Sequence, residues 1–221
     1  MLRIMKIIDI DNWERKSQFL NFSKYTHPVF SVGVRLDVTD LVSYCQKNNY
    51  SFFTVFLYIV SKCGNRIPEM KTRFEDDKVV QHDVVHPSYV VLRKDNCIAT
   101  CLTQFDEDFN KFYAETQKDI EWVKNDGSEK EFNPRIRTDC LYVSSMQWID
   151  ITAFSNPYNF EDAEQTSIPR IMWGKYVERP DGRYEMGFNI SAHHGFMDGW
   201  HIAQFITGIE DALKNINVFL G

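Results

Sequence analysis

Residues 186–201 decide the fold, and they read Met-Gly-Phe-Asn-Ile-Ser-Ala-His-His-Gly-Phe-Met-Asp-Gly-Trp-His. Up to His194, apolar and polar residues alternate, as they do along a β-strand whose successive side chains point to opposite faces. After Gly199 the period changes, and apolar residues recur at helical spacing at Trp200, Ala203, Ile206, Ile209, Leu213 and Ile216. The pattern predicts a strand, a glycine-flanked turn and an amphipathic helix.

The two histidines at the end of this strand fall on opposite faces. His194 continues the apolar row that begins at Met186, so we expect it to face inward and His193 to face polar surroundings. An imidazole that closes a buried strand, with Asp198 four residues later, favours catalysis over packing. No phosphate-cradling glycine loop or serine nucleophile elbow accompanies it. A general base acting on a substrate's own hydroxyl or thiol fits this pattern.

Two other interpretations of the turn stay open. Asp198 stands where its carboxylate can cap the helix that starts near Gly199. His194, Asp198 and His201 are also metal-ligand types in close sequence. However, their spacing differs from H-E-x-x-H, and no other cysteine or carboxylate pairs with them obviously. We therefore expect no metal site, and we expect His201 on the helix surface.

The rest of the chain reads as one α/β domain over residues 1–221 with a mixed sheet. Its length of 221 residues and its hydrophobic content of 43% suffice for one sizeable core. Alternation and turn residues predict strands at 30–36, 89–93, 97–104, 140–148, 170–178 and 183–194, with a further hairpin turn at Asp76-Asp77. Helical spacing predicts helices at 40–47, 52–66 and 105–124, of which 52–66 is apolar nearly all round and therefore buried.

Charge and cysteine content exclude several classes of function. The formal net charge is −6, which argues against a nucleic-acid or anionic-membrane surface. The longest apolar run, 52–60, is too short to span a bilayer, and the first residues lack a signal peptide's apolar core. Five cysteines at irregular spacing indicate a reduced, cytoplasmic protein.

His193-His194-Gly195-Phe196-Met197-Asp198-Gly199 matches the HHxxxDG signature of the chloramphenicol acetyltransferase family, and more loosely that of related CoA-dependent acyltransferases. Asn12-Trp13-Glu14-Arg15 is similar to the family's N-terminal Asn-Trp-x-Arg, Ser144 to Trp148 resembles its Ser-x-x-x-Trp strand, and Gly174-Lys175-Tyr176 its Ala-Lys-Tyr. These landmarks keep the family's order across almost the whole chain. The resemblance implies a two-layer α/β sandwich that forms homotrimers, with active sites between subunits.

The resemblance also assigns chemical roles. His194 would be the general base that takes a proton from a chloramphenicol hydroxyl as this oxygen attacks acetyl-CoA, the co-substrate, with no acyl-enzyme and no metal. Asp198 would pair with Arg15 and hold the turn rather than orient the base directly. Ser144 would donate a hydrogen bond to the tetrahedral oxyanion. The implied function is antibiotic resistance by O-acetylation.

The binding residues follow the family less closely. Lys175 and Tyr176 match positions at the CoA tunnel, whereas Ser51 replaces the family's other tunnel lysine. Phe30 and Phe154 match aromatic positions of the antibiotic pocket. Phe22 stands where a tyrosine is usual, and Met172 stands where a threonine is usual. Residues 26–29 also differ from the usual Leu-Pro-Cys-Gly. The alternatives are a relative that acylates a different hydroxyl- or amine-bearing small molecule, a non-catalytic binding relative and, third, a metal hydrolase.

Overall fold

The structure, a computed structural model, describes residues 5–126 and 137–221. Its larger sheet has six strands in the order β2-β9-β8-β7-β5-β6. They are β2 (Val29–Asp37), β5 (His86–Leu92), β6 (Ile98–Leu102), β7 (Cys140–Met146), β8 (Arg170–Glu178) and β9 (Tyr184–His193). The pairs β5–β7 and β7–β8 are parallel and the others antiparallel, which confirms a mixed sheet.

A smaller sheet adjoins it, with the strand order β1-β4-β3. Its strands are β1 (Met5–Ile7), β3 (Thr72–Glu75) and β4 (Lys78–His82). Asp76 and Asp77 join β3 to β4 with φ values of 49° and 59°. Asp tolerates this left-handed backbone better than most residues, and two such residues in succession suit a tight hairpin.

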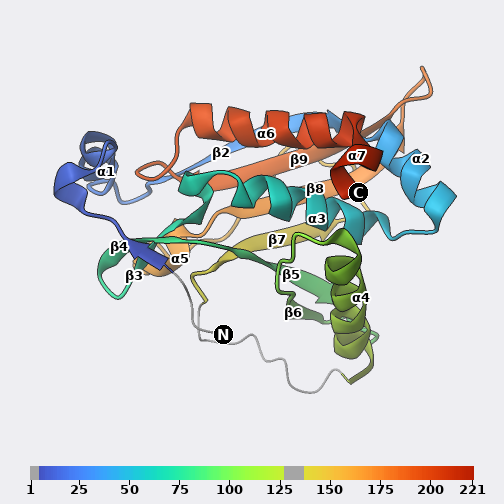
Figure 1. Cartoon of the computed structure of the whole chain (residues 1–221), viewed down its shortest axis with the longest axis horizontal. Coiled ribbons are helices and arrows are strands. Elements are labelled where there is room, and N and C mark those ends of the chain that lie inside the picture. The colour runs from blue at the N-terminus through green and yellow to red at the C-terminus, as the bar shows by residue number, and fades with distance from the viewer. Residues whose placement is uncertain (1–4, 127–136) are drawn as a thin grey trace.

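Seven helices accompany the two sheets within the described residues. They are α1 (Lys16–Phe22), α2 (Thr39–Asn48), α3 (Phe52–Asn65), α4 (Phe109–Asp126), α5 (Ala163–Ser167), α6 (Gly199–Lys214) and α7 (Ile216–Leu220), with 3-10 turns η1 (Ile10–Asn12) and η2 (Pro68–Lys71). Helices α3 and α6 run along one face of the large sheet, and α1 lies beyond the end where β9 meets α6 (Figure 1). The arrangement is the expected two-layer α/β fold.

The core lies between the large sheet and α3 and α6. Phe56 of α3 packs edge-on against Trp173 of β8 and Phe188 of β9, with ring centroids 4.9 and 6.1 Å away. The start of α3 is capped by Ser51, whose hydroxyl accepts a hydrogen bond from the Thr54 backbone N–H. Burial of this helix on nearly all sides therefore agrees with its continuous apolar sequence.

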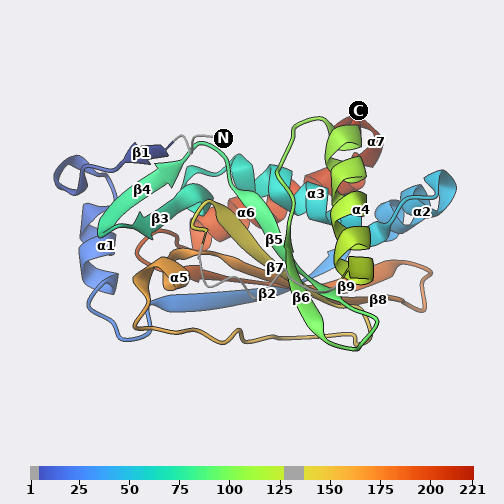
Figure 2. The same ribbon diagram turned by 90° about the horizontal axis from the view of Figure 1, so that it is seen from below.

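The opposite face of the large sheet, here called the outer face, is covered by chain rather than by a helix. After β7, residues 147–162 run back along β2 to α5 and are here called the covering chain (Figure 2). It lies so close to β8 and β9 that a Cβ atom at Gly187 would come 2.0 Å from the Ile151 carbonyl oxygen, and one at Gly174 2.8 Å from that of Ile149. Glycine at these two positions lets the backbone of residues 149–151 sit directly on the strands.

Two expectations about environment can be compared with the structure. No helix within the described residues is long and apolar enough to cross a membrane. All five cysteines are free thiols, and all but Cys97 are buried. The four buried cysteines thus act as small core residues.

Candidate active site

Asp198 is the centre of the predicted site and begins α6. One of its carboxylate oxygens accepts a hydrogen bond from the Trp200 backbone N–H at 3.0 Å, so it caps the helix. Its other oxygen accepts from Arg15 Nη1 at 2.9 Å, which confirms the expected contact between these side chains. Partial burial raises the pKa of Asp198, but the hydrogen bond from Arg15, the nearby His201 and the Trp200 N–H together bring it below its ordinary value.

His201 also belongs to this network, contrary to the prediction that it lies on the helix surface. Its side chain is only 12% exposed, and its Nδ1 lies 2.8 Å from the Asp198 carboxylate. Its Nε2 lies 3.5 Å from Glu69 on η2. The helical spacing alone could not show this, because His201 occupies the first turn, where side chains reach back to the capping residue. A capping residue three positions before it is the signal that would have found it.

His194 is held by aromatic rings rather than by a carboxylate. The ring of Phe22 stacks on its imidazole at 3.9 Å and 9°, and Phe30 lies at 4.5 Å. Nδ1 of His194 is buried and makes no hydrogen bond within the described part of the chain. Arg15, Phe22, Phe30, His194 and Asp198 are called the His194 cluster below.

His193 does not face polar surroundings, and this prediction is wrong. Its side chain is 3% exposed and packs against Phe74 and Phe196 at ring distances of 5.7 and 4.8 Å. Burial, with a smaller effect from His194, lowers its pKa to about 4. Its Nδ1 accepts a hydrogen bond from the Gly195 N–H, so the hydrogen of the neutral ring sits on Nε2. Polar residues that alternate along a strand can face a second layer of the chain as well as solvent, and here Phe74 and Phe196 cover His193.

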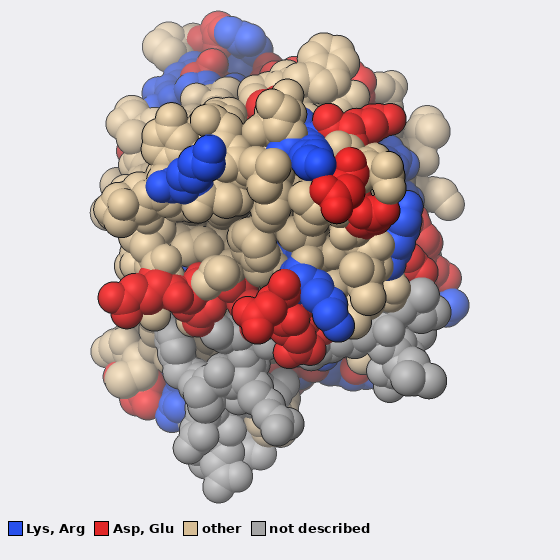
Figure 3. All heavy atoms as spheres, turned by 90° about the vertical axis from the view of Figure 1, so that its left-hand side faces the viewer, with Lys and Arg blue, Asp and Glu red and all other residues tan. Residues whose placement is uncertain are grey.

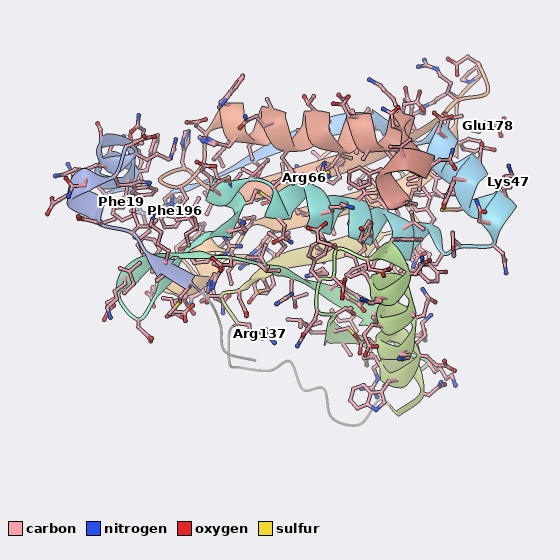
Figure 4. The ribbon with its side chains drawn as sticks, in the orientation of Figure 1. Phe19, Lys47, Arg66, Arg137, Glu178 and Phe196 are labelled. Atoms are coloured by element: carbon pink, nitrogen blue, oxygen red, sulfur yellow. The ribbon has the colours of Figure 1, made fainter. Side chains whose placement is uncertain are left out.

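An aromatic cluster supports the turn between β9 and α6. Phe19 of α1 stacks on Phe196 of the turn at 5.8 Å and 21°, and the two lie side by side at the α1 end of the molecule (Figure 4). Trp13 contacts both rings, at 5.6 and 6.3 Å. On the surface of this end, acidic and basic side chains are scattered around a largely uncharged area (Figure 3).

Ser144 and Met172 lie elsewhere, on the outer face. They are directly opposite each other on β7 and β8, and Met172 is opposite Asn189 on β9, so all three side chains share one face. The half-buried Ser144 hydroxyl makes no hydrogen bond with any described residue. Phe154 belongs to the covering chain that crosses this face and is half-buried.

Lys175 and Tyr176 lie at a bulge in β8. Two residues of β8, Gly174 and Lys175, stand opposite the single Gly187 of β9, and the bulge leaves Lys175 exposed. Tyr176 turns to the helix side, where it contacts Phe52 at 4.8 Å. It lines a surface pocket together with Val42, Cys45, Gln46, Asn49, Tyr50 and Phe52.

One chain does not bring the predicted site together. Asn189 of β9 lies level with Ser144 of β7, two strands away, and His194 is five residues beyond Asn189 along the chain. At ~4.8 Å per strand and ~3.3 Å per residue, Ser144 and His194 are therefore about 19 Å apart. Tyr176 is opposite Met186 and is about 26 Å from His194 by the same measure. Phe22 and Phe30 lie beside His194, whereas Met172 lies beside Ser144 and Phe154 belongs to the segment that crosses the outer face.

Neither the His194 cluster nor the outer face contains a cluster of metal-ligand side chains among the described residues. In residues 5–126 and 137–221, no group of three or more His, Cys, Asp or Glu side chains is placed to hold a metal ion. His194, Asp198 and His201 stand close in sequence, but Asp198 and His201 bond to each other while His194 stacks on Phe22.

A family model described as chloramphenicol acetyltransferase matches residues 4–210 of this sequence. The chain belongs to the chloramphenicol acetyltransferase family. It is 29% identical over 220 residues to a chloramphenicol acetyltransferase of Clostridium perfringens, and the match covers 97% of each chain. A solved chloramphenicol acetyltransferase structure superimposes with a TM-score of 0.80 at 25% identity, covering 96% of this chain and 100% of that one.

More distant structures share the fold of this chloramphenicol acetyltransferase family member. A probable dihydrolipoamide acetyltransferase from Listeria monocytogenes 4b F2365 has a TM-score of 0.67 at 16% identity, with coverage of 91% of this chain and 90% of that one. The family match, together with the full-length relatives, makes the chain an acyltransferase.

Proposed function

We propose that the protein acetylates a hydroxyl group of chloramphenicol, with acetyl-CoA as co-substrate. The arrangement of His194 carries this proposal. Its imidazole is held by the rings of Phe22 and Phe30, while the Asp198 carboxylate is turned to Arg15 and His201. An imidazole held at the end of a strand is suited to accept a proton from a substrate alcohol.

The proposed reaction needs no covalent enzyme intermediate. His194 takes the hydroxyl proton while the acceptor oxygen forms a bond to the thioester carbonyl carbon of acetyl-CoA. The tetrahedral intermediate then collapses, the carbon–sulfur bond breaks, and the imidazolium returns its proton to the departing CoA sulfur. Because Nδ1 of His194 is enclosed, Nε2 is the nitrogen that we assign to this proton transfer.

Ser144 would stabilise the intermediate by donating its free hydroxyl to the oxyanion. This hydroxyl is about 19 Å from His194 in one chain, so the two act together only if different copies supply them. A homotrimer with active sites between subunits satisfies this requirement. In each site the His194 cluster of one subunit would face the outer face of the next.

The pocket at Tyr176 is the place that we assign to CoA. Tyr50, Phe52 and Tyr176 provide aromatic surfaces there, and the exposed Lys175 beside them provides a positive charge for a phosphate. Ser51, in the position of the family's second tunnel lysine, is occupied as the cap of α3. We place the reaction in the cytoplasm, where it would confer chloramphenicol resistance.

The direct test measures release of the CoA thiol from acetyl-CoA in the presence of chloramphenicol. The wild-type protein and the His194→Ala variant are compared at equal concentration, with isothermal titration to establish that each binds acetyl-CoA. Histidine-dependent release supports the proposal. Binding of acetyl-CoA without release in the wild type excludes chloramphenicol as acceptor.

A second candidate is acetylation of a different small molecule. Met172 stands on the outer face, where the family's usual threonine would offer a hydroxyl, and it is 5% exposed. The absence of that hydroxyl at Met172 supports an acceptor other than chloramphenicol.

A further inference from the structure

A buried arginine lies beside the residues assigned to the acceptor. Arg170 begins β8 and is two positions from Met172, so both side chains project from the outer face, about 7 Å apart along the strand. It is opposite Tyr142 on β7 and Ser191 on β9. Only 9% of Arg170 is exposed.

The covering chain packs its aromatic and carbonyl groups on this arginine. The guanidinium carbon lies 3.8 Å from the ring centre of Tyr158 and 5.6 Å from that of Tyr142. Nη1 donates a hydrogen bond to the Pro157 carbonyl oxygen. Nearby, Asn156 donates to the Ser191 hydroxyl at 3.4 Å, so residues 156–158 form a polar wall on the same face as Phe154.

The charge of Arg170 has no counter-ion in the described chain. None of the described carboxylates lies within ion-pair distance of it, and its Nε is buried with no hydrogen-bond partner among those residues. Burial lowers the pKa of Arg170 from its ordinary value, but a guanidinium keeps its proton in proteins. An uncompensated buried cation is costly, and a ligand that brings a negative charge relieves that cost.

A second polar atom on this face also lacks a partner. Oδ1 of Asn189 is buried opposite Met172 and accepts no hydrogen bond from the described residues. It calls for a donor such as a hydroxyl, whereas Arg170 calls for an anion. Asn189 lies on the strand next to that of Arg170 and two residues along it, a separation that a small molecule can span.

We propose that Arg170 is a specificity-determining residue and that the physiological acceptor is a hydroxyl-bearing molecule with an anionic group, such as an aromatic hydroxy acid. The inference rests on the proposed function for the assignment of the acceptor to the outer face. The anionic group binds near the guanidinium, after displacing the Pro157 carbonyl or beside it, and the aromatic part packs on Phe154 and Tyr158. Chloramphenicol, which carries no anionic group, would then be a poorer acceptor.

The test compares two acceptors that differ in charge alone, 4-(hydroxymethyl)benzoate and 4-(hydroxymethyl)benzamide, by CoA thiol release. We expect the carboxylate to have a kcat/KM about tenfold or more above that of the amide, since hydrogen bonds to charged groups are the stronger ones. Arg170→Met should remove this preference and Arg170→Lys should retain part of it. Arg183→Met, which removes an exposed arginine from the β8–β9 turn, serves as the control and should leave the preference intact.

A binding measurement keeps the inference separate from the proposed function. Titration calorimetry with 4-methylbenzoate and 4-methylbenzamide measures binding without turnover. We expect only the acid to bind measurably to the wild type. Equal binding of the two, or an unchanged preference in a folded Arg170→Met protein of unchanged oligomeric state, would overturn the inference. If no acceptor releases CoA but the acid still binds through Arg170, the proposed reaction fails and the anion site stands.

Discussion

The His194 cluster and the outer face differ in whether their charged groups are paired. In the His194 cluster, Asp198 bonds to Arg15, to the Trp200 N–H and to His201, and aromatic rings hold the imidazole. On the outer face, the Ser144 hydroxyl, Arg170 Nε and Asn189 Oδ1 have no partner in the described chain. Buried nitrogens of Arg15 (Nε and Nη2) and His194 (Nδ1) also lack a hydrogen-bond partner among the described residues, so the difference lies in charge. In the His194 cluster, the finished half, Arg15 is paired with Asp198 within one subunit, whereas on the outer face, the unfinished half, Arg170 has no counter-ion among the described residues. We propose that a substrate and a second subunit complete the outer face.

The largest expected effect follows from removing the base. His194→Ala should lower kcat by about 10²–10⁴-fold, the range that a positioned general base contributes. The circular dichroism spectrum and the oligomeric state should not change, because the side chain makes no hydrogen bond through its buried Nδ1. Activity near that of the wild type would show that the His194 cluster does not supply the base.

Ser144→Ala tests the role of the outer face. Loss of one oxyanion donor should reduce kcat by about 10²–10³-fold with little change in the KM for the acceptor. Stability should stay constant, because the hydroxyl has no partner among the described residues. A raised KM with unchanged kcat would instead make Ser144 a substrate-binding residue.

Asp198→Asn should act on the finished half through its structure. Asn retains a side-chain oxygen that can cap α6, but it removes the charge from an ion pair in which the Asp198 side chain is 35% exposed, so we expect a loss of about 1 kcal/mol in the free energy of unfolding. The rate should fall as well, because the same turn carries His194. Urea unfolding and steady-state kinetics measure the two effects, with Asp181→Asn in the exposed β8–β9 turn as the control. A variant that loses neither stability nor rate would contradict the role of the pair.

The last expected effect concerns acid stability and His193. Unfolded, this histidine takes up a proton near pH 6.5, but folded it does so only near pH 4. Its contribution to the free energy of unfolding is therefore full above pH 6.5 and is lost as the pH falls toward 4, by about 3 kcal/mol at ~1.4 kcal/mol per pKa unit. His193→Asn keeps an acceptor for the Gly195 N–H and does not titrate, so its stability should fall less between pH 7 and pH 4.5. The same decline in both proteins would show that His193 is not responsible.

The sequence predicted the finished half better than the unfinished one, for a physical reason. The strand, turn and helix around Asp198 follow from local periodicity and capping, and the resemblance supplied Arg15, which is remote in sequence. The environment of His193 depends on Phe74 of β3, which is remote in sequence, and on Phe196 of the following turn. Likewise, the position of Arg170 beside Met172 is clear only once the strand register is known.

The central claim is that a complete site needs two subunits, and subunit complementation tests it most directly. His194→Ala and Ser144→Ala chains carrying different tags are co-expressed, and assemblies that contain both are purified. If each site takes His194 from one copy and Ser144 from another, a trimer that contains both chains has one intact site in three, so about a third of the wild-type activity should be restored. Activity no greater than that of the two separate variants, in assemblies shown to contain both chains, would contradict the account.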